Sequence, residues 1–176
     1  MTLLDILPSR GRAALPVVLD SNIEIARTAS LAHRRQPVLI GVTPDIDIHG
    51  HRAITTGISD HKFGFTLAEG RAADAVKQVL AHPYLELVGL HCQIGSQVTN
   101  PALYGEAIRR MIAAMADIRT AHGVILTELT IGGDRQLTLD ELADVIDDAL
   151  EEACAAERFP RPTVLVEPGR GISGPA

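Results

Sequence analysis

The sequence predicts an α/β protein, specifically a partial (β/α)8 (TIM-type) barrel with parallel strands inside and helices outside. Short apolar runs alternate with helical segments along the chain, and this order implies crossover connections between parallel strands. A closed eight-stranded barrel usually takes around 250 residues, whereas this chain has 176 residues. We therefore expect a single domain over residues 1–176 that corresponds to an incomplete barrel.

The expected strands are apolar runs bounded by polar or turn-forming residues, a pattern typical of buried strands. They are Pro16–Asp20, Val38–Thr43, Leu85–His91, Leu126–Ile131 and Thr163–Glu167. The segment Asp45–Asp60 is rich in histidine, threonine, glycine and aspartate. We expect this segment to be a long connection rather than a pair of strands.

Capping signals mark the expected helix starts. A serine or threonine followed three residues later by glutamate can form a reciprocal capping box. This pattern occurs at Ser21 with Glu24, Thr66 with Glu69, and Thr138 with Glu141. A further helix is expected to begin at Asn100-Pro101 and to stop at Gly123, because asparagine caps well, proline suits the first helical position and glycine suits a left-handed stop.

Composition and charge restrict the classes of partner. The chain is 46% hydrophobic and 22% charged, as expected for a soluble globular protein. No apolar stretch approaches a bilayer span and the N-terminus lacks a secretion-signal pattern, so we expect a cytoplasmic protein with no membrane partner. The net charge of −6 without a basic stripe argues against nucleic acid. Cys92 and Cys154 lie in separate expected elements, so they are interpreted as packed thiols rather than a disulfide.

Several phrases, in a fixed order, carry a family resemblance. They are Val18-Leu-Asp-Ser21, Thr56-Gly57, Lys62-Phe63-Gly64, Gly89-Leu-His-Cys-Gln-Ile-Gly-Ser-Gln97 and Glu167-Pro-Gly-Arg170. In this order and spacing the chain resembles diaminopimelate decarboxylase, a pyridoxal-phosphate-dependent decarboxylase with an alanine-racemase-like barrel. The resemblance extends from about Leu15 to Ala176 and covers only the middle of the family's barrel.

The resemblance implies a pyridoxal 5′-phosphate site. Glu167 matches the glutamate that pairs with the pyridine nitrogen, where a carboxylate keeps the ring protonated and improves it as an electron sink. Arg170 matches a residue that binds the cofactor phosphate, for which planar paired donors are suited. Ser96 matches a further phosphate contact, and glycines beside it permit close backbone approach. The expected cofactor-binding residues are His91, Gln93, Gly95, Ser96, Gly132, Gly133, Glu167, Gly169 and Arg170.

The chain also departs from the family pattern. The family's Schiff-base lysine lies in a segment that matches nothing here, and the only lysines are Lys62 and Lys77, so no catalytic residue is assigned. Gln93 stands where family members usually have a histidine that stacks on the cofactor. His91 shares the facing direction of Gln93 in a strand, and we expect it to be a packed histidine.

Two further departures lie later in the chain. The family's glycine-rich phosphate loop is shortened to Ile131-Gly-Gly-Asp134, and Asp134 would place negative charge near a bound phosphate. The family's C-terminal β-domain is absent from the sequence, and with it the residues that contact substrate from there. We therefore expect this chain alone to have no normal decarboxylase activity.

Several functional interpretations stay open. The first is a decarboxylase part, acting on meso-diaminopimelate to make lysine when another polypeptide supplies the missing lysine and strands. The second is a non-catalytic regulatory or subunit-binding homologue, and the third is a truncated gene product. A metal-dependent barrel hydrolase using His49, His51 and His61 is a further alternative, although the preferred interpretation assigns no metal ligand. Uncovered strand edges favour a homo- or hetero-oligomer.

Overall fold

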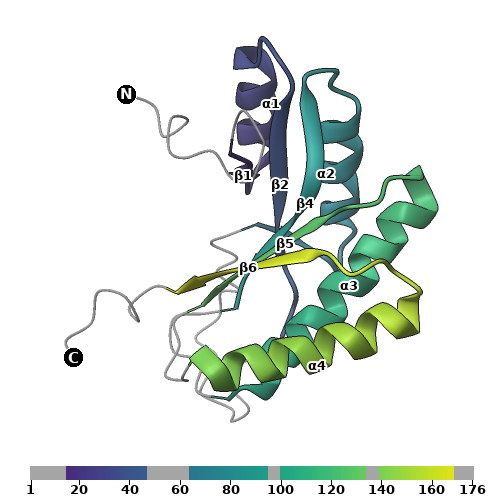
Figure 1. Cartoon of the computed structure of the whole chain (residues 1–176). Coiled ribbons are helices and arrows are strands. Elements are labelled where there is room, and N and C mark those ends of the chain that lie inside the picture. Colours follow the sequence, from purple (N-terminus) through teal and green to yellow (C-terminus); the bar gives the residue numbers. More distant parts are fainter. Residues whose placement is uncertain (1–14, 47–63, 95–99, 134–138, 169–176) are drawn as a thin grey trace, which may run out of the picture.

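The computed structural model describes residues 15–46, 64–94, 100–133 and 139–168. In these ranges strands and helices alternate along the chain (Figure 1). The elements are β1 Val17–Leu19, α1 Asn22–Leu31, β2 Gln36–Thr43, β3 Phe65–Thr66, α2 Arg71–Leu80, β4 Leu85–Gln93, α3 Ala102–His122, β5 Glu128–Gly133, α4 Leu139–Glu157 and β6 Thr163–Pro168.

All strand pairs are parallel, and the main sheet has the order β1-β2-β4-β5-β6. The short strand β3 pairs with the end of β2. The strand order follows the chain order. Right-handed crossover connections therefore bring all the helices to the same face of the sheet, as in a barrel. The expectation of a parallel partial barrel is therefore confirmed. All five expected strands are present, with bounds shifted by one or two residues, and β3 is the strand that the sequence did not predict.

Two of the expected capping signals can be compared with the structure. The Glu24 amide donates to Ser21 Oγ at 3.3 Å, and the Asp20 amide donates to Glu24 Oε2 at 2.7 Å. The α1 start is thus confirmed, although the return bond goes to the residue before the cap. The helix start predicted at Thr66 is wrong. Thr66 belongs to β3, where pairing with Thr43 holds the backbone extended, and α2 begins only after Gly70.

The other helix ends follow the sequence closely. Asn100 Oδ1 accepts the Ala102 amide at 3.0 Å, so it caps α3, which begins one residue after Pro101. Gly123 ends α3 in the left-handed region with φ 68°, as expected. Helix α4 begins at Leu139; the capping pair expected at Thr138 lies outside the described residues.

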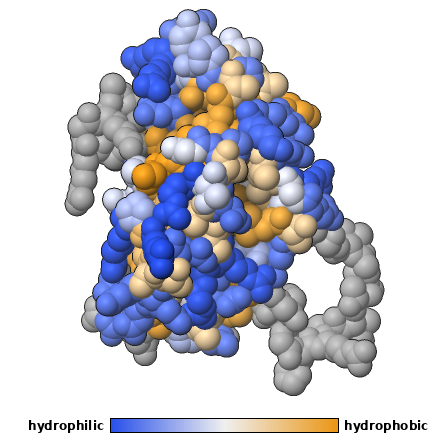
Figure 2. All heavy atoms as spheres, turned by 90° about the vertical axis from the view of Figure 1, so that its right-hand side faces the viewer, coloured by the Kyte–Doolittle hydropathy of each residue, from blue (hydrophilic) through white to orange (hydrophobic). Residues whose placement is uncertain are grey.

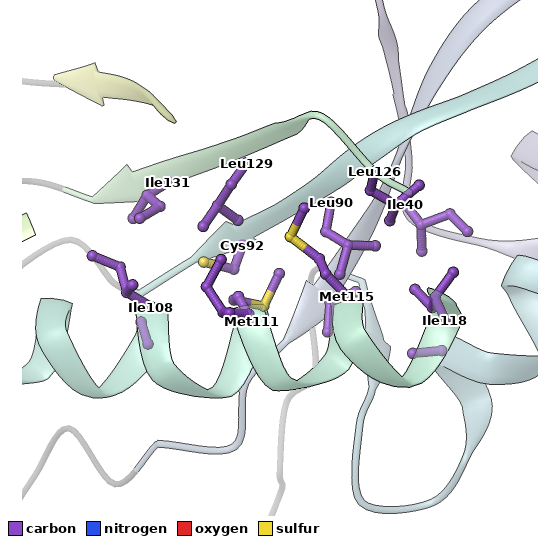
Figure 3. Close-up of a cluster of buried hydrophobic side chains, with 14 of the residues drawn as sticks. Ile40, Leu90, Cys92, Ile108, Met111, Met115, Ile118, Leu126, Leu129 and Ile131 are labelled. Carbon is purple, nitrogen blue, oxygen red and sulfur yellow. The ribbon is translucent and has the colours of Figure 1, made fainter. Parts of the chain in front are cut away.

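The core lies between the sheet and the long helix α3 (Figure 3). Leu90 and Cys92 of β4 and Leu129 and Ile131 of β5 point toward α3. From α3, Ile108, Met111 and Met115 fill the facing layer and are fully buried. Helix α4 packs against α3, and Arg109 Nη1 lies 3.3 Å from Glu152 Oε2 across that contact. This apolar layer covers one face of the sheet, and the candidate site lies on the opposite face.

The molecular surface over α2, α3 and α4 is mainly hydrophilic, with apolar patches between the helices (Figure 2). Among the described residues, no helix is long and apolar enough to cross a membrane.

Candidate functional site

A bulge in β4 decides which of its side chains face away from the helices. Val38 of β2 pairs with Leu87, but Leu39 pairs with Gly89, so Val88 is an extra residue in β4. One inserted residue reverses the facing direction of everything that follows it. Leu90 and Cys92 therefore point to α3 (Figure 3), and His91 and Gln93 point to the opposite face.

The register aligns polar residues in two rows on this opposite face, which we call the groove face. Gly41, His91 and Thr130 are mutual neighbours in one row. Gln93, Gly132 and Glu167 form the next row, one step nearer the carboxyl ends of the strands. In parallel α/β proteins, ligands bind at this end of the sheet.

The groove face is hollowed into a cavity of about 650 Å³. Its lining includes Leu39, Glu128, Thr130, Leu165 and Glu167. Leu165 is 46% exposed, which shows that this apolar face is only partly covered within the described residues. The cavity is large enough for a small cofactor.

A close contact between a histidine and a carboxylate joins β4 and β6. His91 Nε2 lies 3.7 Å from Glu167 Oε2. The His91 side chain is 13% exposed, whereas that of Glu167 is 60% exposed. The carboxylate of Glu167 is therefore accessible to a ligand from the cavity while the imidazole approaches it from the sheet. His91 is largely packed, as the sequence suggested, but one of its ring nitrogens is turned to Glu167.

The side chain of Gln93 lies across the next strand. A Cβ atom added at Gly132 would collide with Gln93 Oε1, and it would lie 3.6 Å from Glu167 Oε2. The amide of Gln93 thus occupies the space over Gly132, beside the Glu167 carboxylate. A glycine at this position is required for that arrangement.

Asp20, directly after β1, belongs to the phrase Val18-Leu-Asp-Ser21, for which the family resemblance implies no cofactor contact. Its Oδ1 atom is buried and has no hydrogen-bond partner within the described part of the chain. Burial raises the pKa of Asp20, and the nearby His91 partly opposes this rise. The sequence did contain one signal for a site role: Asp20 is a carboxylate directly after an expected strand, and site residues gather at the carboxyl ends of parallel strands.

The remaining predicted site residues fall into two groups. Gly132 and Gly133 end β5, where they pair with Glu167 and Pro168 of β6. Gly95, Ser96, Gly169, Arg170 and Asp134 lie outside the described residues, so their roles stay predictions. Lys62 also lies outside them, and Lys77 is exposed on α2, where its Nζ pairs with Asp74 at 3.2 Å.

Two other candidates do not reach the groove face. Cys92 is fully buried on the helix side, and burial raises the pKa of its thiol to about 12, so it is a packing residue. Cys154 lies on α4, and burial also raises the pKa of its thiol.

The histidine cluster of the metal alternative, His49, His51 and His61, is outside the described residues. Within the described ranges, no group of three or more potential ligands is placed to hold a metal ion.

A parallel sheet whose cavity is lined by a carboxylate near the carboxyl end of β6 defines a class that the comparisons with known proteins identify. Residues 12–174 match the family model described as the pyridoxal-binding domain of pyridoxal-dependent decarboxylases. The chain belongs to this family.

Within the family, the similar curated relatives are diaminopimelate decarboxylases. The enzyme of Actinosynnema pretiosum is 40% identical over 177 residues, covering 96% of this chain and 40% of the relative. That of Bacillus subtilis is 32% identical, covering 91% of this chain and 39% of the relative. The resemblance found in the sequence is confirmed.

Solved structures give the same result. The diaminopimelate decarboxylase of M. jannaschii is 28% identical with a TM-score of 0.73, over 88% of this chain and 38% of that one. The Helicobacter pylori enzyme, complexed with L-lysine, is 25% identical with a TM-score of 0.66, over 89% of this chain and 40% of that one. The chain therefore spans about 40% of the length of the relatives it matches.

Proposed function

We propose that this chain forms the pyridoxal-phosphate-binding part of a diaminopimelate decarboxylase barrel. The observation that carries the proposal is the Glu167 carboxylate, which lies at the carboxyl end of β6, lines the cavity and is 60% exposed. The proposed substrate is an amino acid, meso-diaminopimelate, and the proposed location is the cytoplasm. The remaining strands and the cofactor-linking lysine would come from residues outside this chain.

The residues present fit the ring of the cofactor. A carboxylate open to the cavity can accept a hydrogen bond from the N–H group of a pyridinium ring, and a charge-assisted hydrogen bond of this kind holds the ring in its protonated form. When bound, the cofactor supplies an electron sink for the carbanion that is left after carbon dioxide departs. His91 supports the carboxylate at 3.7 Å from its Oε2 atom. Gly132 leaves room for the Gln93 amide beside this carboxylate.

The phosphate end depends on residues that we assign by resemblance. Arg170, Ser96, Gly95 and Gly169 are proposed to bind the phosphate, together with the backbone of Gly132 and Gly133. These two glycines end β5 in the rows that pair with Glu167 and Pro168, which puts them near the proposed ring site.

A complete enzyme of this family needs a lysine that links the cofactor, and we assign no residue of this chain to that role. Lys77 projects from α2 and pairs with Asp74, and α2 packs on the helix side of the sheet. A polypeptide of only these 176 residues is therefore proposed to bind the cofactor without a covalent bond and without turnover. Association with a complementary polypeptide would supply the missing lysine.

Cofactor binding tests the proposal directly. Pyridoxal phosphate is titrated into the purified chain and followed by its visible absorbance, with Glu167→Gln as the test variant. Glu86→Gln is the matched control, because Glu86 is an exposed glutamate near the start of β4. We expect saturable binding that Glu167→Gln weakens and Glu86→Gln leaves unchanged. Equal binding by both variants, or none by the wild type, would refute the proposed site.

Turnover is tested by carbon dioxide release from meso-diaminopimelate. We expect none from the chain alone. Turnover should appear when the chain is combined with the part of the A. pretiosum relative that this chain does not match. Robust carbon dioxide release by the chain alone would contradict the proposal that a second polypeptide supplies the lysine and the remaining strands.

A non-catalytic, subunit-binding role is the second candidate. The partly covered groove face, with Leu165 46% exposed, is the observation that favours it. Stable association with the complementary polypeptide without any turnover would support this candidate instead.

A further inference from the structure

Two glycines on the groove face allow polar side chains to lie across the strands. A Cβ atom at Gly41 of β2 would collide with the Asp20 carboxyl group, and one at Gly132 of β5 would collide with the Gln93 amide. Each glycine thus leaves room for a polar group from the preceding strand in the sheet. A side chain that could not cross in this way would point straight into the cavity.

The crossing directions connect four residues from the two register rows of the groove face. Gly41 is the direct neighbour of His91 in the register, so Asp20 extends over β2 toward His91. Gly132 is the direct neighbour of Glu167, so Gln93 extends over β5 toward Glu167. His91 Nε2 closes the gap between them at 3.7 Å from Glu167 Oε2. We call Asp20, His91, Glu167 and Gln93 the polar row.

The carboxyl group of Asp20 lies in an energetically unfavourable environment. Its Oδ1 atom is buried without a hydrogen bond from the described residues, an arrangement that costs free energy. The Asp20 amide is held separately, by Glu24 Oε2 at 2.7 Å. The Asp20 carboxyl group lies over Gly41, the direct register neighbour of His91, which brings the two side chains to the same part of the groove face.

An imidazole with a carboxylate on one side presents a defined nitrogen on the other. The hydrogen bond made by one ring nitrogen decides the protonation state of the second. In the polar row the nitrogen that faces the carboxylate of Glu167 is Nε2, and the Asp20 carboxyl group lies over Gly41, the register neighbour of His91.

We propose that Asp20 is a positioning residue that orients the His91 imidazole toward Glu167, while Gln93 holds the same carboxylate from across Gly132. This inference rests on the proposed function, in which Glu167 contacts the ring of the cofactor. It also gives Gln93 a role of its own. The residue that replaces the family's stacking histidine becomes a second support for the glutamate.

The first experiment needs no cofactor. The chain is labelled with ¹⁵N-histidine, and the ring resonances of His91 are assigned from the signals lost in His91→Gln. Asp20→Asn keeps the side-chain size but removes the charge, and we expect it to shift both ring ¹⁵N resonances of His91 at constant pH. Asp74→Asn is the control, because Asp74 is exposed on α2 and pairs only with Lys77 among the described residues; it should leave them unchanged.

A second variant guards against misfolding of the first. Gly41→Ala displaces the Asp20 carboxyl group without removing it, and it should shift the same resonances. Urea midpoints are measured for all variants, so that a loss of folding is recognised separately. Unchanged His91 resonances in a folded Asp20→Asn or Gly41→Ala variant would overturn the inference.

The second experiment measures pyridoxal phosphate affinity. Asp20→Asn and Gln93→Leu should each weaken binding about three- to tenfold, an effect similar in size to the net contribution of one hydrogen bond. If the wild type binds no cofactor, the proposed function fails while the His91 resonances still test the row. If the wild type binds and both variants bind equally well, the row has no role in the site and the proposed function stands.

Discussion

The substitution Gly89→Ala tests how closely β4 and β5 approach. A Cβ atom at Gly89 would collide with the backbone carbonyl of Glu128, its partner in the register. Unlike a flexible side chain, a strand backbone can make room only by moving away. Overpacking of this kind costs about 1–3 kcal/mol. The adjacent hydrogen bond from the Thr127 amide to the Val88 carbonyl, at 2.9 Å, would be strained and adds roughly 1 kcal/mol.

We therefore expect Gly89→Ala to lower the free energy of unfolding by about 2–4 kcal/mol. With a urea dependence of about 1–3 kcal/mol per molar, the unfolding midpoint should fall by roughly 1–2 M urea. Gly105→Ala in α3 is the matched control, because its nearest foreign atom, Ala149 Cβ, lies at an ordinary 3.6 Å. That control should gain about 0.5–1 kcal/mol from helix propensity. A midpoint for Gly89→Ala at or above that of the wild type would refute the close approach.

Changes in the core, at a thiol and at Asp20 give three further expected outcomes. Met111→Ala should cost about 2–5 kcal/mol in urea unfolding, because Met111 is fully buried, whereas Leu31→Ala, at a position 62% exposed, should change stability by less than about 0.5 kcal/mol. Cys92 should resist alkylation at about pH 8 in the folded chain and react in denaturant, as followed by mass spectrometry, because only the thiolate reacts and its pKa is about 12. The folded state binds the Asp20 proton more tightly than the unfolded state, since burial raises that pKa, so stability should fall as pH rises from the ordinary aspartate range through the folded-state pKa. Asp20→Asn should flatten that part of the curve of urea midpoint against pH, and an unchanged curve would contradict the assignment.

The alternation of strands and helices could be predicted from sequence because each apolar run is bounded by strong local signals. Ser21 and Gly123 act through neighbouring backbone groups, so their effect is readable without the fold. Thr66 shows the limit of this reasoning. Its spacing to Glu69 suits a helix cap, but pairing of Phe65–Thr66 with β2 is a contact between distant residues and decides the backbone there.

The candidate site was predictable in its residue types but not in its geometry. Glu167 and Gln93 were identified from the resemblance to a family, and the structure puts both beside Gly132. The facing direction of His91 depends on the extra residue Val88, which alternation along β4 alone does not reveal. The position of Asp20 could not be predicted from the sequence. It depends on burial of the carboxyl group and on the space above Gly41, and both arise only when the strands pair.

The bulge at Val88 separates two sets of requirements along a single strand. Beyond it, Leu90 and Cys92 are constrained by the volume available beneath α3, whereas His91 and Gln93 lie on the groove face beside Glu167. Tolerance to substitution should therefore alternate residue by residue in β4. An exchange such as histidine for Gln93 can change the chemistry of the groove face during evolution while the neighbouring position preserves the packing under α3.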